Sequence, residues 1–240
     1  MKKAPHSANQ HDGWRRLMLL SFSGIDGAGK TTQIQQLHSR LSQAGFRICK
    51  LSFWDDVAVL SRFREGITHR LFGSEKGVGA PGLPVERRDK NLRAWYLTLS
   101  RHWLYLLDAL HLCWIVRRLQ AADIDVLIFD RYIYDELANL PLRSHVARLY
   151  LQFVNRIVPA PDVAYLLDVE PSLAQQRKPE YPVKFLCENR QCFLEMALSL
   201  ENMKVIRASG VDEAQDQIMQ MLTDSDLRRQ ELCSQSTLRP

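Results

Sequence analysis

The chain has no hydrophobic run long enough for a membrane span. Its longest apolar stretch, residues 103–116, is interrupted by Asp108 and His111 and is too short to cross a bilayer. The amino terminus begins with two lysines after Met1, and no apolar core follows them, so the sequence predicts no secretory signal peptide. We therefore expect no contact with a membrane and a location in the cytoplasm.

Cysteine is scarce and is not arranged in pairs. An odd number of widely spaced cysteines without a C-x-x-C pair favours free thiols in a reducing compartment. The same spacing argues against a zinc site, because no second ligand pair completes a tetrahedron. The five cysteines are Cys49, Cys113, Cys187, Cys192 and Cys233.

No block of like charge stands out either. The net charge is +5, and a good part of it lies near the two ends of the chain. Elsewhere Lys and Arg are dispersed, and Arg117-Arg118 is too short a run to form a stripe for nucleic acid. We therefore expect no nucleic-acid partner, and we assign the basic residues of the interior to the binding of small anionic substrates.

A complete phosphate-binding loop motif is present. Residues 24–31 match G-x-x-x-x-G-K-[ST], with an apolar run of strand length before them (17–23) and a helical apolar spacing after them (30–44). This order turns backbone N–H groups and the helix dipole toward a polyphosphate. Lys30 can reach the terminal phosphates, and the Thr31 hydroxyl can ligate Mg²⁺. We expect ATP and Mg²⁺ as cofactors, bound by Gly24, Ile25, Asp26, Gly27, Ala28, Gly29, Lys30, Thr31 and Thr32.

A second motif ends the apolar run 125–130. Its last residue is Asp130, and a phosphate-binding loop needs such a carboxylate nearby to hold Mg²⁺. The alternative is a core strand whose terminal aspartate caps the next turn. Arg131 follows at once, at the edge of a parallel sheet where ligands bind, and its guanidinium can hold a phosphate. We therefore expect Thr31 and Asp130 as metal ligands and Lys30 and Arg131 as catalytic residues.

Strands and helices alternate along the chain, which predicts an α/β fold with a parallel sheet covered on both faces. We expect a polar tail over residues 1–15, one domain over 16–223 and a second polar tail, frayed or loosely helical, over 224–240. The expected strands are 17–23, 47–54, 125–130, 163–168 and 204–206. The expected helices are 30–44, 87–120 (one long helix or two abutting ones), 143–157, 171–178, 183–200 and 211–222.

The loop taken together with Asp130-Arg131-Tyr132 resembles the thymidylate kinases. Residues 161–177 and the spacing of Phe185, Arg190 and Phe193 are similar to later segments of that family, so the resemblance covers about residues 18–222. It implies a P-loop nucleoside monophosphate kinase fold: three layers, a doubly wound sheet of five parallel strands in the order 2-3-1-4-5, and a short lid at about residues 175–184. It also implies an ATP-dependent phosphotransferase of nucleotide biosynthesis that converts dTMP into dTDP.

The resemblance implies roles for single residues as well. Asp26 matches the carboxylate that binds the 3′-hydroxyl of the acceptor sugar, and Arg131 matches the arginine on the acceptor phosphate. Because no arginine stands beside the loop carboxylate, the lid must supply that charge, and we assign Arg177 as catalytic with Lys178 as its neighbour. The alternative for these two is a solvated helix end. For Arg190 it is packing or a surface ion pair.

The chain departs from the family pattern on the long helix. The base-reading arginine of the family is missing, because the corresponding segment is 108–111. Arg101 lies two turns earlier on nearly the same face, and we expect it to bind the substrate instead. Most aromatic residues of this helix are expected to be packing residues.

A second departure follows the second strand, where residues 53–57 replace the family's Arg-Glu-Pro-Gly-Gly. Arg64, or alternatively Arg62, is expected to bind the acceptor phosphate from the next helix. Asp55 and Asp56 either bind a sugar hydroxyl or a metal–water cluster, or they are plain turn formers.

These departures leave the acceptor open. A diverged kinase for another nucleoside, nucleotide or phosphorylated metabolite is the alternative to a dTMP kinase. An ATPase switch or nucleic-acid-associated ATPase is less expected because Lys and Arg are dispersed beyond the two tails. A silent nucleotide-binding protein is less expected because Lys30, Thr31, Asp130 and Arg131 are intact. The apolar side of the long helix predicts either a homodimer face or part of a monomer core, through Leu104, Leu107, Leu110 and Trp114.

Overall fold

A five-stranded, all-parallel sheet in the order β2-β3-β1-β4-β5 forms the centre of the molecule. The computed structural model describes residues 17–59, 95–138 and 145–236, and of residues 95–101 and 226–236 only the helical backbone. The predicted strand order is confirmed. The strands are β1 (Met18–Ser23), β2 (Ile48–Ser52), β3 (Val126–Asp130), β4 (Val163–Leu167) and β5 (Met203–Ile206).

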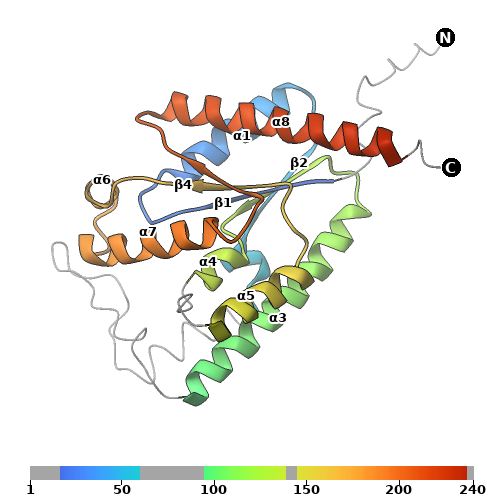
Figure 1. Ribbon diagram of the computed structural model, residues 1–240. Coiled ribbons are helices and arrows are strands. Elements are labelled where there is room, and N and C mark those ends of the chain that lie inside the picture. The colour runs from blue at the N-terminus through green and yellow to red at the C-terminus, as the bar shows by residue number, and fades with distance from the viewer. Residues whose placement is uncertain (1–16, 60–94, 139–144, 237–240) are drawn as a thin grey trace, which may run out of the picture.

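Helices cover both faces of the sheet, which gives the expected three layers (Figure 1). One face carries α1 (Lys30–Gln43) and α8 (Val211–Ser236). The other carries α3 (Trp95–Gln120), α4 (Ile133–Leu137), α5 (His145–Ile157) and α7 (Val183–Ala197). The short α6 (Pro171–Arg177) lies beyond the end of β4 (Figure 1). Among the helices of the described residues, none has the length and hydrophobicity that a membrane span requires.

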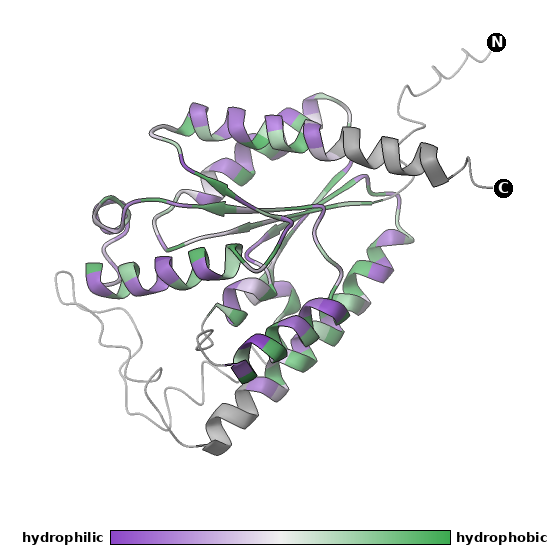
Figure 2. Ribbon diagram, viewed as in Figure 1, coloured by the Kyte–Doolittle hydropathy of each residue, from purple (hydrophilic) through white to green (hydrophobic). Residues whose placement is uncertain are grey.

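The central strands are mostly apolar because both of their faces are covered. All residues of β1 and β4 are buried, and Figure 2 shows the strands as mostly hydrophobic ribbons between more mixed helices. Leu20 of β1 pairs in register with Ile128 of β3 and Val163 of β4. The parallel register brings the carboxyl ends of all strands to one edge of the sheet, where the candidate site residues follow.

The structure differs from the sequence-based expectation at several element boundaries. The second strand ends at Ser52, and residues Phe53–Val57 form a single π-helical turn, η1. The Asp56 carboxylate accepts a hydrogen bond from the Ser52 N–H at 2.7 Å, so Asp56 is a turn-forming residue. The helix α4 was not expected because five residues are too few for a helical period to be recognised.

The two longest helices also differ in extent from the prediction. Of the expected helix 87–120, residues 95–120 are helical and residues 87–94 lie outside the described part of the chain. The last helix was expected to end near residue 222, but α8 continues to Ser236. It therefore takes in most of the segment that the sequence predicted as a frayed or loosely helical tail.

Candidate active site

The phosphate-binding loop joins the buried end of β1 to α1. Gly24, Gly27 and Gly29 have φ angles of 142°, 84° and 88°, in the region that residues with a side chain rarely adopt. Gly27 also lies against α6: a Cβ built on it would be 2.2 Å from the carbonyl oxygen of Ala174. The loop therefore needs glycine at this position both for its backbone angle and for its contact with the next layer.

Lys30, the lysine of the motif, is folded back across this loop. Its ammonium donates hydrogen bonds to the carbonyl oxygens of Gly24 at 2.8 Å and Ile25 at 3.0 Å, and the residue is only 7% exposed. Burial, together with repulsion from Arg131, lowers the pKa of Lys30 to about 8. A buried ammonium held by carbonyl oxygens gains from an incoming anion, so the loop fits a polyphosphate.

Arg131 and Asp26, which the sequence assigned separately to the acceptor, are in direct contact. The Arg131 Nη2 donates a hydrogen bond to the Asp26 carboxylate. Burial alone would raise the pKa of Asp26, but the charges of Arg131 and Lys30 outweigh it and leave that pKa lowered. Arg131 has a positive φ of 67°, and its N–H bonds the carbonyl of Phe22 at 3.0 Å. This unusual backbone turns its guanidinium toward the phosphate-binding loop.

Asp135 supports Arg131 and was missed by the sequence analysis. Its carboxylate accepts hydrogen bonds from the Ser23 hydroxyl at 2.6 Å and from the Tyr132 N–H at 3.2 Å, and it lies 4.0 Å from Arg131 Nη1. Burial raises the pKa of Asp135. An acidic residue three positions after Tyr132, at the start of a helix, has the spacing of a capping residue. That spacing was the signal from which Asp135 could have been predicted.

The residues predicted to bind Mg²⁺ are at the carboxyl edge of neighbouring strands. Thr31 is the second residue of α1 and is exposed. Asp130 ends β3, and its carboxylate lies 3.8 Å from the Lys50 ammonium. Within the described ranges, no three His, Cys, Asp or Glu side chains come together as a metal centre. A hydroxyl and one carboxylate nonetheless fit Mg²⁺, which takes few protein ligands and completes its shell with water and phosphate oxygens.

A cavity of about 210 Å³ opens next to the loop. It is lined by Thr32 of α1, by Asp168 after β4, by Arg177 at the end of α6 and by residues 208–211, which lead from β5 to the first residue of α8. The segment 208–211 was not among the predicted site residues, because nothing in its composition points to a ligand. Its position beside the phosphate-binding loop is a consequence of the strand order alone.

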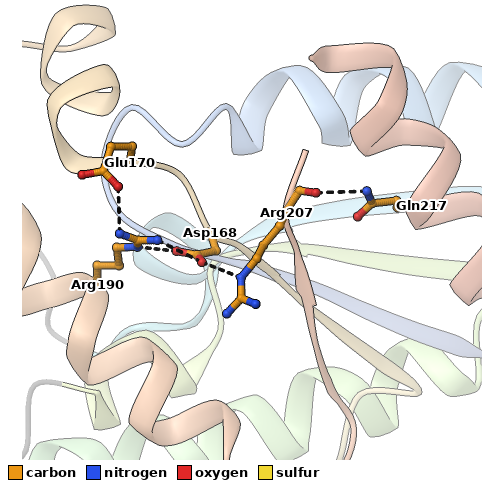
Figure 3. A network of polar contacts seen from close by, with 5 residues as sticks. All are labelled: Asp168, Glu170, Arg190, Arg207 and Gln217. Carbon is orange, nitrogen blue, oxygen red and sulfur yellow. Dashed lines mark hydrogen bonds and ion pairs between the residues drawn. The ribbon is translucent and has the colours of Figure 1, made fainter. Parts of the chain in front are cut away.

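The lid residues have different surroundings. Arg177 lines the cavity, whereas Lys178 forms an ion pair with Glu180 at 3.1 Å. Lys178 still contributes to lowering the pKa of Asp26, so its charge acts on the site. Arg190 binds Asp168 and Glu170, and Figure 3 shows it reaching from α7 toward both carboxylates. For Arg190 the ion-pair interpretation therefore describes the observed contacts.

Two predicted substrate residues cannot be placed. Arg64, with its alternative Arg62, lies outside the described residues, and of Arg101 only the helical backbone is described. At the segment where the family reads the base, Asp108 is buried and accepts a hydrogen bond from the Val59 N–H at 2.7 Å. His111 Nδ1 contacts the carbonyl of Val57 at 2.7 Å. These residues of α3 anchor the chain that follows η1.

The chain is similar to known thymidylate kinases. No protein-family model matches it. Over 187 residues it is 28% identical to a probable thymidylate kinase of Archaeoglobus fulgidus, a match that covers 75% of this chain and 82% of that protein. Over 211 residues it is 27% identical to a thymidylate kinase of Bifidobacterium longum (strain DJO10A), covering 82% and 92%.

A solved structure agrees with these relatives. The crystal structure of thymidylate kinase from Ehrlichia chaffeensis matches with a TM-score of 0.54 at 20% identity, covering 86% of this chain and 99% of that one. This match shows the shared fold. In sequence and in fold, the chain is thymidylate-kinase-like.

Proposed function

We propose that the chain is an ATP-dependent thymidylate kinase, which transfers the γ-phosphoryl group of ATP to dTMP and releases dTDP and ADP. The contact between Arg131 and Asp26 carries this proposal, because it joins a phosphate-binding cation and a hydroxyl-binding carboxylate at the edge of the phosphate-binding loop. The names of the relatives support the same acceptor. We place the reaction in the cytoplasm, because the cysteines of the described residues are free thiols.

The chain contributes alignment and positive charge, which is most of what phosphoryl transfer requires of a protein. The loop amides and Lys30 would hold the terminal phosphates of ATP, and Thr31 and Asp130 would hold Mg²⁺. When bound, Mg²⁺ supplies charge neutralisation between the phosphates. The carboxylate of Asp26 would accept a hydrogen bond from a sugar hydroxyl, and its partner Arg131 would share its guanidinium with the acceptor phosphate.

The cavity beside the loop is the candidate site for the donor nucleotide. Thr32, Arg177 and residues 208–211 form part of its lining. We propose that the base and sugar of ATP lie in this cavity, with Arg177 near the phosphates. A donor in the cavity and an acceptor at Arg131 would reach the loop from opposite sides, as transfer of a phosphoryl group in line requires.

A screen of acceptors tests the proposed function. The full chain is assayed with MgATP and dTMP, dUMP, UMP, CMP and deoxynucleosides, and ADP formation is followed. We expect dTMP to be phosphorylated with the highest kcat/KM. Turnover of another acceptor in the absence of dTMP turnover would support a diverged kinase instead. ATP hydrolysis without any acceptor dependence would support an ATPase switch.

Arg131→Ala is expected to lower kcat/KM for dTMP by at least about 10²-fold, because a charge clamp is lost from the transition state. The matched control is Arg47→Ala, which removes an arginine bound to Asp125 at the opposite edge of the sheet. The Arg47 variant should keep the wild-type rate. Wild-type turnover in the Arg131 variant would refute its assignment to the site.

We also propose that the protein forms a homodimer through the apolar side of α3 and α5. Trp103, Leu107, Leu110 and Trp114 of α3 are 45–60% exposed and recur every three or four residues, so they form one stripe. Leu149 and Phe153 of α5, 65% and 52% exposed, extend the patch on a helix that packs against α3. In a two-fold dimer, this patch would pack against the same patch of a second copy. The family resemblance also implies a dimer through the long helix.

Sedimentation analysis tests this assembly. The wild-type chain is expected to have the mass of a dimer at micromolar concentration, and Leu110→Glu to have that of a monomer, because a charge in an apolar interface is unpaired. Leu198→Glu, at an apolar residue just after α7 that is 90% exposed and lies on neither α3 nor α5, is the control for a surface charge. A monomeric wild-type protein would refute the proposal.

A further inference from the structure

One carboxylate, that of Asp168, is the centre of an ion-pair network beside the cavity (Figure 3). Its side chain is 2% exposed and follows the last residue of β4. It accepts hydrogen bonds from Arg190 Nε at 2.5 Å and Nη2 at 3.2 Å, and from Arg207 Nε at 3.0 Å. Two arginines from different elements therefore meet on one buried acid.

The first arm of the network leads to α6. Arg190 extends from α7, and its Nη1 donates a hydrogen bond to Glu170 Oε2 at 3.0 Å. Glu170 is the residue directly before α6, and α6 ends at Arg177, which lines the cavity. Asp168 is thereby connected, through Arg190, to the helix that carries the cationic residue of the lid.

The second arm leads to the opposite wall of the cavity. Arg207 follows the last residue of β5, and its carbonyl oxygen accepts a hydrogen bond from Gln217 of α8 at 3.0 Å. Residues 208–211, which line the cavity, come directly after it. Figure 3 shows Arg207 reaching toward Asp168 while its backbone faces Gln217. This arm fixes where the wall formed by 208–211 begins.

We propose that Asp168 is a positioning residue for the donor nucleotide: it holds the walls of the cavity, α6 on one side and segment 208–211 on the other, at the spacing that ATP requires. This inference rests on the proposed function, because it assigns the cavity to ATP. The outer partners Glu170 and Arg207 are 65% and 70% exposed, and ion pairs so exposed add little to stability. A buried acid with two cationic partners serves the geometry of the site more than the free energy of folding.

Two variants, each at an exposed side chain, test the two arms of the network separately. Glu170→Ala cuts the contact to α6, and Arg207→Ala cuts the contact to β5, while each leaves Asp168 paired with Arg190. We expect each to weaken MgATP binding about 5- to 10-fold, as for the loss of a charged hydrogen bond. Isothermal calorimetry measures the Kd of MgATP, and steady-state assays measure KM for ATP and dTMP. KM for dTMP should stay within about 2-fold of wild type.

Asp168→Asn removes the charge that both arms need while keeping the shape of the side chain. It is expected to weaken MgATP binding by more than either single arm, and Arg47→Ala, far from the cavity, to leave it unchanged. Arg207→Lys should restore part of the affinity, because a cation returns to Asp168. Equal changes in KM for ATP and dTMP, or a lower melting temperature with unchanged ATP affinity in the Glu170 and Arg207 variants, would overturn the proposal.

Calorimetry separates a failure of this inference from a failure of the proposed function. ATP binding is measured without any acceptor, so a wild-type protein that binds MgATP but does not phosphorylate dTMP still allows the test. If the wild-type protein binds no MgATP, both proposals fall. If it binds MgATP and the three variants bind it equally well, only the role of Asp168 is refuted.

Discussion

Lys30→Met is expected to lower kcat/KM by at least about 10²-fold and, at the same time, to stabilise the ligand-free protein. The loss of activity follows from the proposed role of this ammonium, which is to hold the terminal phosphates of ATP. The gain in stability follows because burial disfavours that ammonium, as its pKa of about 8 shows. Activity and stability should therefore move in opposite directions.

The size of the stability change comes from two opposing effects. Lowering the pKa of Lys30 from 10.5 to about 8 corresponds to ~3 kcal/mol of cost to the charged form at neutral pH. The variant loses two hydrogen bonds, to Gly24 and Ile25, worth about 1 kcal/mol each. We expect a net gain of about 1 kcal/mol in the free energy of unfolding, measured by urea denaturation below pH 8 without nucleotide.

Lys184→Met is the matched control, because Lys184 is exposed on α7. It should change neither turnover nor the free energy of unfolding by a measurable amount. A Lys30→Met protein that is less stable than wild type would show that the two hydrogen bonds outweigh the burial of the charge. A fully active Lys30→Met protein would remove the loop from the mechanism.

Those parts of the fold and site that depend on local pattern could be predicted from the sequence. The strand before Gly24, the helix after Lys30 and the apolar run ending at Asp130 each carry their signal within a few residues. The strand order 2-3-1-4-5 came from the resemblance, and the structure confirms it. Once that order holds, the carboxyl ends of β1 and β3 are neighbours, so Arg131 must lie near the loop.

Contacts between distant residues could not be predicted. Ser23 and Asp135 are 112 positions apart, and Arg190 and Asp168 are 22 apart on different elements. No periodicity or motif connects such pairs, because their partner is chosen by the packing of a helix against a strand end. The cavity wall at residues 208–211 could not be predicted for the same reason. These residues line the cavity only because β5 pairs with β4, and their own sequence carries no motif.

The two departures from the family pattern turn out to be connected. One departure follows β2 and the other lies on α3. The two segments meet through a hydrogen bond between Val59 and Asp108, which are 49 positions apart in the chain. Asp108 binds the N–H of Val59, and His111 contacts the carbonyl of Val57, so α3 anchors the segment after η1. A carboxylate on α3 and a π-helical turn after β2 therefore form one local arrangement. We therefore expect the acceptor preference of this enzyme to depend on η1 and on the segment 108–111 of α3.

Gly27→Ala is expected to destabilise the protein by at least about 3 kcal/mol, because its Cβ would meet backbone atoms that cannot rotate away. The nearest of these is the Ala174 carbonyl oxygen, at 2.2 Å, and the Ala174 carbonyl carbon follows at 2.9 Å. The positive φ of 84° adds about 1–2 kcal/mol of backbone strain. Thermal unfolding of the ligand-free protein measures the total.

Gly29→Ala separates the two causes. Its φ of 88° is nearly the same, so the strain should be about the same 1–2 kcal/mol, but a Cβ at Gly29 has no atom within 4 Å. The difference between the two variants is then the contact between the phosphate-binding loop and α6. Equal melting temperatures for Gly27→Ala and Gly29→Ala would show that α6 yields freely to the loop. A larger loss in Gly27→Ala would show that the loop and α6 are packed as one unit, so that movement of α6 must move the residues that we propose to bind the phosphates.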